Sequence, residues 1–308
     1  MTTILYTDPV FARHVTPNGH PECIDRILAV QKALSAPRFA SLVRRTAEPA
    51  PEAAITAVHP ESYVRKLDEA TPSSGLVAID ADTALGPHTM KAARVASGSA
   101  IAAVDAVVSG EARNAFVACR PPGHHAERAV AMGFCFLNHV AIAARHARDA
   151  HGIGRVAIVD FDVHHGNGTQ DIFERDGSVY YVSTHQSPWY PGTGAAGERG
   201  VGNILNVPLP SGTTGADYRA VFDAAVMPAL GAFEPEFVIL SAGFDAHVDD
   251  PLGGMLLTED DFVWITRRMM ELADRTAEGR LISCLEGGYD LAALGRSAAD
   301  HVATLAGV

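Results

Sequence analysis

The sequence is poor in cysteine, in basic residues and in long apolar segments. Its four cysteines, Cys23, Cys119, Cys135 and Cys284, form no C-x-x-C pair, so we expect reduced, mostly buried thiols in a cytoplasmic protein. No uninterrupted apolar segment reaches membrane-spanning length, and no basic segment followed by an apolar core opens the sequence. These absences predict a protein without a membrane span or a secretory leader.

Basic residues are outnumbered by acidic ones. The chain has 24 Lys and Arg against 36 Asp and Glu, which gives a formal net charge of −12. Because phosphate contacts need a basic face, this balance predicts no nucleic-acid partner. Of the 308 residues, 47% are hydrophobic, which is enough to bury a large core. Since the sequence holds no repeat, low-complexity tract or linker, we predict one domain over residues 1–308.

The most informative stretch is residues 156–168. Residues 156–159 are a short apolar run, typical of a strand that is buried on both faces of a parallel sheet. The run leads into Asp160, Asp162 and His164, which would share one face of an extended strand. Buried carboxylates are costly unless their charge is compensated. The sequence therefore predicts a divalent cation at this strand end, with Asp162 and His164 as ligands.

Three further apolar runs end in polar side chains in the same way. The side chains that follow these runs are His124 and His125, Asp245, and Tyr289. Asp245 would be the third metal ligand, and three protein ligands with an open position indicate a catalytic metal. The tandem histidines suit general acid–base chemistry near neutral pH, and the tyrosine hydroxyl suits donation to an oxyanion. Together these groups predict metal-assisted hydrolysis of an amide.

Other elements are expected around these strands. One helix is expected to begin at residues 20–22, a second to cover roughly residues 87–109, and a third to begin within residues 133–138. In the first helix, Glu22 should favour the helix dipole and Arg26 should lie on the surface. Residues 46–85 should be irregular structure with small helices that form the rim of a pocket. Two acids of this rim, Asp80 and Asp82, could reach a substrate, although solvated loop acids are the more conservative expectation.

Several blocks of the sequence resemble those of the histone deacetylase family. The blocks are residues 120–126, 133–138, 160–168, 241–254 and 286–289. With the His-Pro-Glu sequence at 20–22, they cover essentially the whole chain in the family's order, which makes the resemblance highly specific. The resemblance implies an arginase-like α/β fold, in which helices flank an open parallel sheet of about eight strands in a single domain. It also implies one catalytic zinc ion, although the ligand types alone leave iron open.

The resemblance implies a role for each site residue. The zinc ligands would be Asp162, His164 and Asp245. His125 would be the general base beside His124, and Asp160 would fix the tautomer of His124. Tyr289 would donate its hydroxyl in the transition state. A structural potassium ion is also implied, with ligands from Asp160, Asp162, His164, Ser183 and Thr184.

The substrate channel is expected to have aromatic walls. Phe134 and Tyr190 would enclose a slender alkyl stem. Eukaryotic polyamine deacetylases of this family carry a glutamate where Leu252 stands, so Leu252 favours an acylated lysine, in a peptide or protein, or another neutral-stemmed amide. Asn167 replaces the second aspartate of class I members, and this resembles class II. A small acylated amine stays open as the alternative substrate, and an oligomer stays possible.

Two other interpretations compete with deacetylation. Residues 245–249 match the Asp-x-His-x-Asp motif of ureohydrolases, which would imply two manganese ions. That site needs further acidic ligands that His164 does not provide, so we expect His247 and Asp249 to lie beyond the metal. A scaffold that only binds acylated ligands is disfavoured because every catalytic position is filled.

Overall fold

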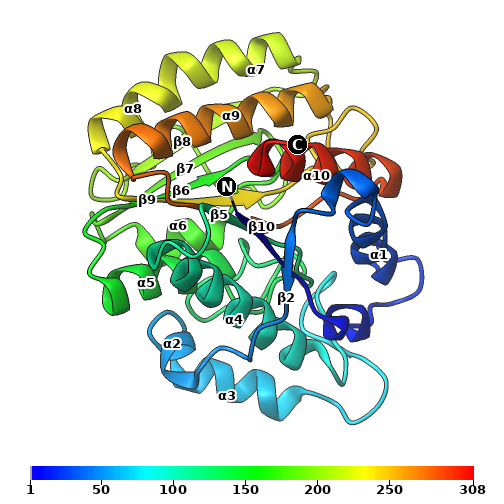
Figure 1. Cartoon of the computed structure of the whole chain (residues 1–308). Helices are drawn as coiled ribbons and strands as arrows, with labels where there is room; N and C mark the ends of the chain where they lie inside the picture. Colours follow the sequence, from blue (N-terminus) through cyan, green and yellow to red (C-terminus); the bar gives the residue numbers. More distant parts are fainter. Residues whose placement is uncertain (1) are drawn as a thin grey trace.

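The computed structural model describes residues 2–308 and is built around one eight-stranded parallel sheet (Figure 1). The strand order is β2-β1-β5-β10-β9-β6-β7-β8. The strands are β1 (Thr3–Tyr6), β2 (Val43–Arg45), β5 (Asn114–Val117), β6 (Val156–Asp160), β7 (Val179–Gln186), β8 (Ile204–Leu209), β9 (Phe237–Ala242) and β10 (Leu281–Leu285). A separate antiparallel pair comprises β3 (Val77–Ala78) and β4 (Ala84–Leu85). The predicted open parallel sheet of about eight strands is confirmed.

Helices cover both faces of the sheet. In Figure 1, α7, α8 and α9 lie on one side, and α4 and α5 lie on the other. The helices are α1 (Ile24–Ala33), α2 (Glu52–Thr56), α3 (Glu61–Ala70), α4 (Thr89–Val108), α5 (His139–His151), α6 (Asn167–Phe173), α7 (Gly215–Val221), α8 (Met227–Phe233), α9 (Glu259–Thr276) and α10 (Leu291–Ala306). A π-helical segment, Phe222–Val226, joins α7 to α8. Because both faces are covered, the central strands β6, β9 and β10 are buried along their whole length and are mostly apolar.

The stretch of residues 156–168 leaves the sheet earlier than expected. Every residue of β6 is buried, but the strand ends at Asp160, so Asp162 and His164 do not continue its alternation. The Asp160 carboxylate accepts from the Asp162 N–H (3.1 Å), and the Asp162 carboxylate accepts from the His164 N–H (2.9 Å). Side-chain bonds of this kind stabilise turns. A bend, and not strand alternation, therefore places these side chains together.

Several element boundaries differ from the predictions. Helix α1 begins at Ile24, and α5 begins at His139 because the Asn138 side chain accepts from the Ala141 N–H (3.0 Å) and caps it. The edge strands β2 and β8 were not predicted. β2 has three residues, and β8 contains Pro208, which an edge strand tolerates. Their periodic signal is therefore weak.

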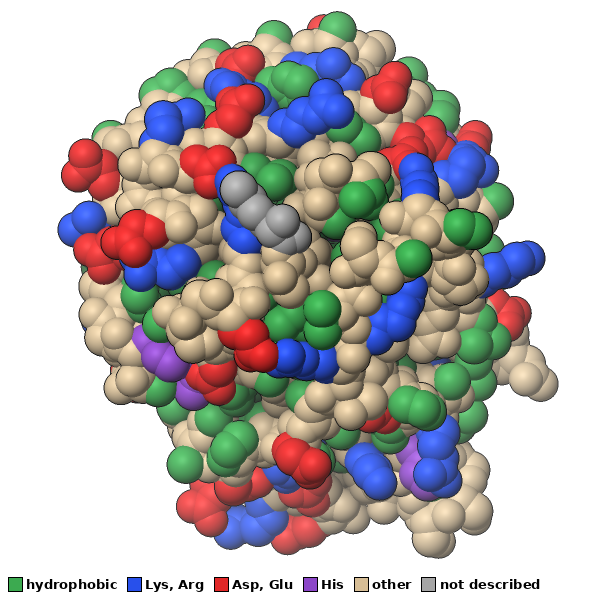
Figure 2. Space-filling model, in the orientation of Figure 1, with side chains coloured by type: hydrophobic (Ala, Val, Ile, Leu, Met, Phe, Trp, Pro, Cys, Tyr) green, Lys and Arg blue, Asp and Glu red, His purple; other side chains and the backbone are tan. Residues whose placement is uncertain are grey.

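Charged side chains are mixed over the surface. On the face drawn in Figure 2, basic and acidic side chains are interspersed. Within residues 2–308, no helix is both long enough and apolar enough for a membrane crossing. The absence of a nucleic-acid partner stays a prediction.

The prediction that Arg26 lies on the surface is wrong, because its side chain is buried. Glu22 is buried too, and the N-cap of α1 is Cys23, so Glu22 does not cap the helix that it precedes. Arg120 donates to the Glu22 carboxylate (Nη2–Oε2, 2.9 Å), and Arg26 donates to its other oxygen (Nη1–Oε1, 3.1 Å). Arg26 also donates to the Gly288 carbonyl (2.6 Å). Burial alone would raise the pKa of Glu22, but Arg120 and a hydrogen bond from His14 hold it well below its usual range. Glu22 therefore anchors two buried cations and caps no helix.

Replacing Glu22 with alanine should lower the free energy of unfolding by about 3–5 kcal/mol, because it leaves two buried guanidinium groups without their counter-ion. Urea unfolding measures this change. Asp300→Asn is the control, since its ion pair with Arg38 is largely exposed and should contribute little. Equal midpoints for the two variants would mean that the buried pairs do not stabilise the fold.

His301, on α10, is a buried ring in a neutral environment. Its Nδ1 lies 2.6 Å from Thr266 Oγ1 and its Nε2 lies 2.9 Å from Ser283 Oγ. The Thr266 hydroxyl donates to the Phe262 carbonyl (2.6 Å), so Nδ1 donates to Thr266 and Nε2 accepts from Ser283. Burial lowers the pKa of His301 to about 3. The folded protein therefore keeps this ring neutral at pH values where a free histidine is charged.

The free energy of unfolding should consequently fall between pH 7 and pH 5. The unfolded chain, with a histidine pKa of about 6.5, takes up a proton that folded His301 does not. The stabilisation is complete above the unfolded pKa and is lost as the pH falls toward the folded value. This group should account for about 2 kcal/mol between pH 7 and pH 5. Urea unfolding of His301→Gln at both pH values should show a correspondingly smaller loss, and an unchanged loss would refute the assignment.

Candidate active site

The predicted site residues converge at the carboxyl edge of the sheet. They lie at the carboxyl end of β6 or on the segments that follow four strands, β5, β6, β9 and β10. The side chains brought together are His124, His125, Asp160, Asp162, His164, Asp245 and Tyr289. This is the edge at which open α/β sheets place their ligands.

Three of these residues form a cluster that can hold a metal ion. Each of Asp162, His164 and Asp245 offers a donor atom within 4.8 Å of the other two, and all three are buried. His164 Nδ1 lies 3.0 Å from Asp162 Oδ1 and 3.1 Å from Asp245 Oδ2. Two backbone N–H groups orient the carboxylates: Val163 donates to Asp245 and Gly287 donates to Asp162, each at 2.8 Å. One nitrogen and two oxygens are a donor set that zinc accepts.

The charges of this cluster also fit a cation. Burial, together with the neighbouring Asp162 carboxylate, raises the pKa of Asp245 to about 7. Burial would likewise raise the pKa of Asp162, but His124 and His164 hold it below its usual range. A β-carbon on Gly287 would collide with both carboxylates. The backbone thus leaves room here for two acids that a divalent ion would neutralise.

The tandem histidines have different partners. His124 Nδ1 lies 3.0 Å from Asp160 Oδ2, which also accepts from the Tyr181 hydroxyl (3.0 Å). His125 Nδ1 lies 2.8 Å from the amide oxygen of Asn167, whose amide nitrogen donates to Glu127 (2.8 Å). An amide oxygen only accepts. His125 therefore carries its proton on Nδ1 and keeps Nε2 free to take another.

The two histidines also differ in charge. Burial alone would lower the pKa of His124, but the carboxylates of Asp162 and Asp160 raise it well above its ordinary value. Burial lowers the pKa of His125 well below its ordinary value, and the neighbouring His124 and His164 lower it further. These shifts favour the charged form of His124 and the neutral form of His125. A neutral imidazole with a free nitrogen is suited to accept a proton.

A cavity of about 350 Å³ opens onto these groups. His125, His164 and Tyr289 lie in its lining, as do the predicted walls Phe134 and Tyr190. The Tyr190 ring is 5.3 Å from that of His125, and the Phe134 ring is 5.9 Å from that of Tyr289, both edge to face. The structure therefore brings both predicted walls to the same cavity as the catalytic candidates.

The mouth of the cavity includes the predicted Leu252 and two residues from the N-terminal part of the chain. The Trp189 indole donates to the Leu252 carbonyl (2.8 Å) and links the two loops of the mouth. His20 and Asp82 also line the cavity, and His20 Nε2 lies 2.9 Å from the Asp82 carbonyl oxygen. Asp80 instead accepts from the N–H groups of its own turn. Of the two acids, Asp82 thus lies where it could reach a substrate, and Asp80 does not line the cavity.

Sequence reasoning assigned no role to Glu286. Its carboxylate accepts from the Gly123 N–H (2.7 Å), the His124 N–H (3.2 Å) and the Ser241 hydroxyl (3.0 Å). It thereby holds the turn that carries the tandem histidines. An acid at the end of the fully buried β10 is the same signal that marked Asp160 at the end of β6.

The predicted potassium ligands lie on β6, β7 and the bend after β6. Ser183 pairs with Asp160 in the register of the two strands, and the Thr184 hydroxyl donates to the Asp160 carbonyl (3.3 Å). The potassium site stays a prediction.

His247 and Asp249 of the ureohydrolase motif are not part of the metal-ligand cluster. His247 Nε2 lies 3.4 Å from Glu259, and its Nδ1 accepts from the Asp249 N–H.

Comparison with known proteins places this geometry in a family. The chain matches the histone deacetylase domain over residues 20–305 and belongs to the histone deacetylase family. It is 38% identical to the chloroplastic histone deacetylase 14 of Arabidopsis thaliana over 94% of this chain and 73% of that protein. It is 39% identical to human polyamine deacetylase HDAC10 over 99% of this chain and 48% of that protein. The solved HDA15 HD domain superposes with a TM-score of 0.93 at 35% identity, over 99% of this chain and 90% of that one.

Proposed function

We propose that this protein is a zinc-dependent amide hydrolase that removes acetyl or other acyl groups from N-acylated lysine side chains. The observation that carries the proposal is the buried Asp162–His164–Asp245 cluster beside a cavity that His125 and Tyr289 also line. Membership of a family whose relatives are named deacetylases supports hydrolysis. Zinc is proposed because two carboxylates and one imidazole leave the open position that catalytic zinc needs.

The residues divide the chemistry between them. Zinc held by the cluster would polarise the amide carbonyl and lower the pKa of a water molecule. His125 takes a proton from the attacking water at its free Nε2 and then gives it to the departing nitrogen. One water is consumed, the amide C–N bond breaks, and a carboxylate and an amine are released. Cationic His124, held by Asp160, favours the developing negative charge.

Tyr289 supplies the remaining hydrogen bond. Burial raises the pKa of Tyr289 well above its ordinary value. The Arg26 guanidinium alone would lower this pKa, whereas the carboxylates of Asp245 and Asp162 raise it. The phenol thus keeps its proton at neutral pH. It can donate this proton to the carbonyl oxygen in a hydrogen bond that strengthens as negative charge develops there.

The walls of the cavity favour a lysine-like stem. Phe134 and Tyr190 present aromatic faces that would contact an alkyl chain. Leu252, at the mouth of the cavity, carries no charge that could attract the free ammonium group of an acylated polyamine. The preferred substrate is therefore an acylated lysine in a peptide or protein.

A second candidate is an N-acetylated polyamine. Asp82 lines the cavity and could attract a cationic substrate, and one relative is named a polyamine deacetylase. Release of acetate from an acetyl-lysine peptide and from an N-acetylated polyamine separates the two candidates. We expect faster release from the peptide, and preference for the polyamine would refute the lysine assignment.

Leu252 variants test the reason for this preference. Leu252→Glu should shift kcat/KM toward the polyamine by about tenfold or more, because a partly desolvated charge pair contributes roughly 1.5 kcal/mol or more. In Leu252→Gln the new side chain has nearly the shape of glutamate but no charge, so this variant should not produce the shift. An equal response of the two variants would show that charge at this position does not select the substrate.

A further inference from the structure

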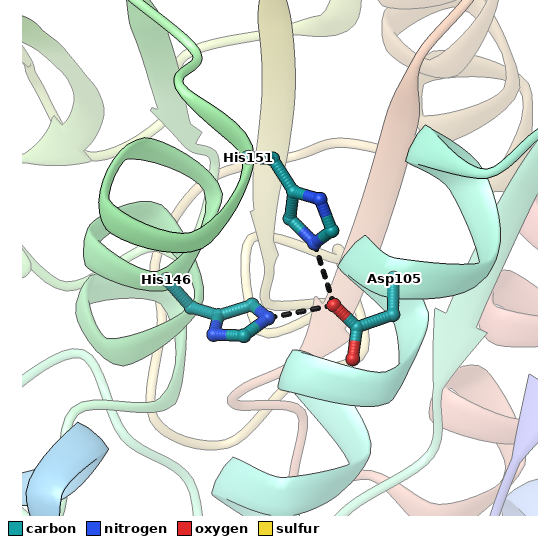
Figure 3. Close-up of side chains that lie close together, drawn as sticks. All are labelled: Asp105, His146 and His151. Atoms are coloured by element: carbon teal, nitrogen blue, oxygen red, sulfur yellow. Dashed lines mark hydrogen bonds and ion pairs between the residues drawn. The ribbon is translucent and has the colours of Figure 1, made fainter.

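A second cluster of metal-ligand side chains lies on the surface between α4 and α5. His146 and His151, both on α5, point toward Asp105 on α4 (Figure 3). The Nε2 atoms of the two rings each lie 2.6 Å from the same oxygen, Asp105 Oδ1. All three donor atoms lie within 4.8 Å of one another. Among residues 2–308, only the Asp162–His164–Asp245 cluster shares this property.

The electrostatic environment of this cluster favours a cation. Asp105 lies in the last turn of α4, which ends at Val108, and His151 is the last residue of α5. The aligned peptide dipoles give the carboxyl ends of both helices a partial negative charge, which adds to that of the carboxylate. Burial alone would raise the pKa of Asp105, but hydrogen bonds from His146 and His151 lower it. The carboxylate is therefore charged and able to bind a metal.

The donor set selects the kind of cation. Two imidazole nitrogens and one carboxylate oxygen suit Zn²⁺, Ni²⁺ and Cu²⁺, whereas Mg²⁺ and Ca²⁺ prefer oxygen ligands throughout. The side chain of Asp105 is 51% exposed and those of His146 and His151 are 20% and 25% exposed. An ion can thus enter from solvent and complete its coordination with water.

We propose that Asp105, His146 and His151 form a second metal site, for a divalent transition-metal ion, that links α4 to α5. The ion would take the place of the two Nε2 protons that now point at Asp105 Oδ1, and each neutral ring would then carry its proton on Nδ1. This site is independent of the proposed deacetylase activity, since α5 spans 13 residues, or about 20 Å, from its end beside the catalytic edge to His151. Its effect is to stabilise the fold by mass action.

Metal titration of the full chain tests this proposal. In an Asp245→Ala background, which removes a catalytic ligand, calorimetric titration with Ni²⁺ or Zn²⁺ should show one remaining site. His146→Ala or His151→Ala should weaken that site by at least about tenfold, because loss of even an outer-shell partner costs tenfold or more. His88→Ala is the matched control, since His88 lies at the opposite end of α4 and pairs with Arg13. The metal affinity of the His88→Ala variant should equal that of the Asp245→Ala parent.

A second measurement avoids the catalytic variant. Cu²⁺ added to the full chain with its catalytic site filled by zinc should give an electron paramagnetic resonance spectrum with coupling to two imidazole nitrogens. His146→Ala should reduce this coupling to one nitrogen and lower the rise in melting temperature that the ion produces. Equal binding by His146→Ala, His151→Ala and the His88→Ala control would overturn the proposal, as would the absence of any ion beyond the first.

Discussion

Replacing Tyr289 with phenylalanine should lower the turnover number by about two to three orders of magnitude, the usual effect of removing one donor to an oxyanion. The variant should keep its fold and its metal, because Tyr289 contributes no atom to the Asp162–His164–Asp245 cluster. The ring should stay in place, since the Arg26 guanidinium lies over it, 4.9 Å from the ring centre, and Phe134 packs against it in a T-shaped arrangement. Steady-state acetate release, with metal content measured on the same sample, gives the result.

Tyr190→Phe is the matched control for this experiment. It removes a hydroxyl from another tyrosine of the same cavity, but that residue is assigned only to the wall. Its turnover number should stay close to that of the parent. If Tyr289→Phe also kept full activity, its role as hydrogen-bond donor would be wrong. Equal losses in both variants would indicate that the cavity, and not the donor, is sensitive to the change.

Asp245→Ala should abolish stoichiometric zinc binding and, with it, acetate release. Asp245 provides one of the three donors, and its removal leaves Asp162 and His164 as the protein ligands at this position. Zinc sites with a catalytic role hold the ion by three protein ligands. Metal analysis after dialysis against a zinc-buffered solution measures the loss. The Asp245→Ala variant should remain folded, because the substitution removes a carboxyl group whose charged form burial disfavours.

Asp249→Ala provides the control for this loss. Asp249 belongs to the same motif of residues 245–249 but is largely exposed and pairs with Arg296. The deacetylase assignment predicts normal zinc content in this variant. A dinuclear manganese site would lose metal on either substitution. Tight stoichiometric zinc in Asp245→Ala would contradict the ligand assignment itself.

The sequence predicts most of the catalytic constellation because strand ends carry it. Asp160, His124 and Asp245 each follow an apolar run, and parallel strands bring their carboxyl ends to one edge. Their convergence therefore needs no knowledge of loop paths. Glu286 also follows an apolar run, at the end of β10, so the same rule could have identified it. Its hydrogen-bond partners could not be predicted from the sequence.

The buried charges near the site were not predictable in this way. Arg120 lies 98 residues from Glu22, and Arg26 lies 260 residues from the Glu286 carbonyl to which it donates. A charged residue near a helix start usually lies on the surface, and no local pattern indicates so distant a partner. The bend after Asp160 was missed for a related reason, since side-chain bonds to the backbone end the strand where alternation would continue it.

The central claim is that zinc at Asp162, His164 and Asp245 is required for amide hydrolysis. The most direct test adds zinc in steps to the chelator-treated protein and measures acetate release from an acetyl-lysine peptide. The account predicts no release without metal, a linear rise to one equivalent and a plateau beyond it, since an ion at Asp105, His146 and His151 adds no activity. Full activity in the metal-free protein, or activity only with two equivalents of manganese, would contradict it.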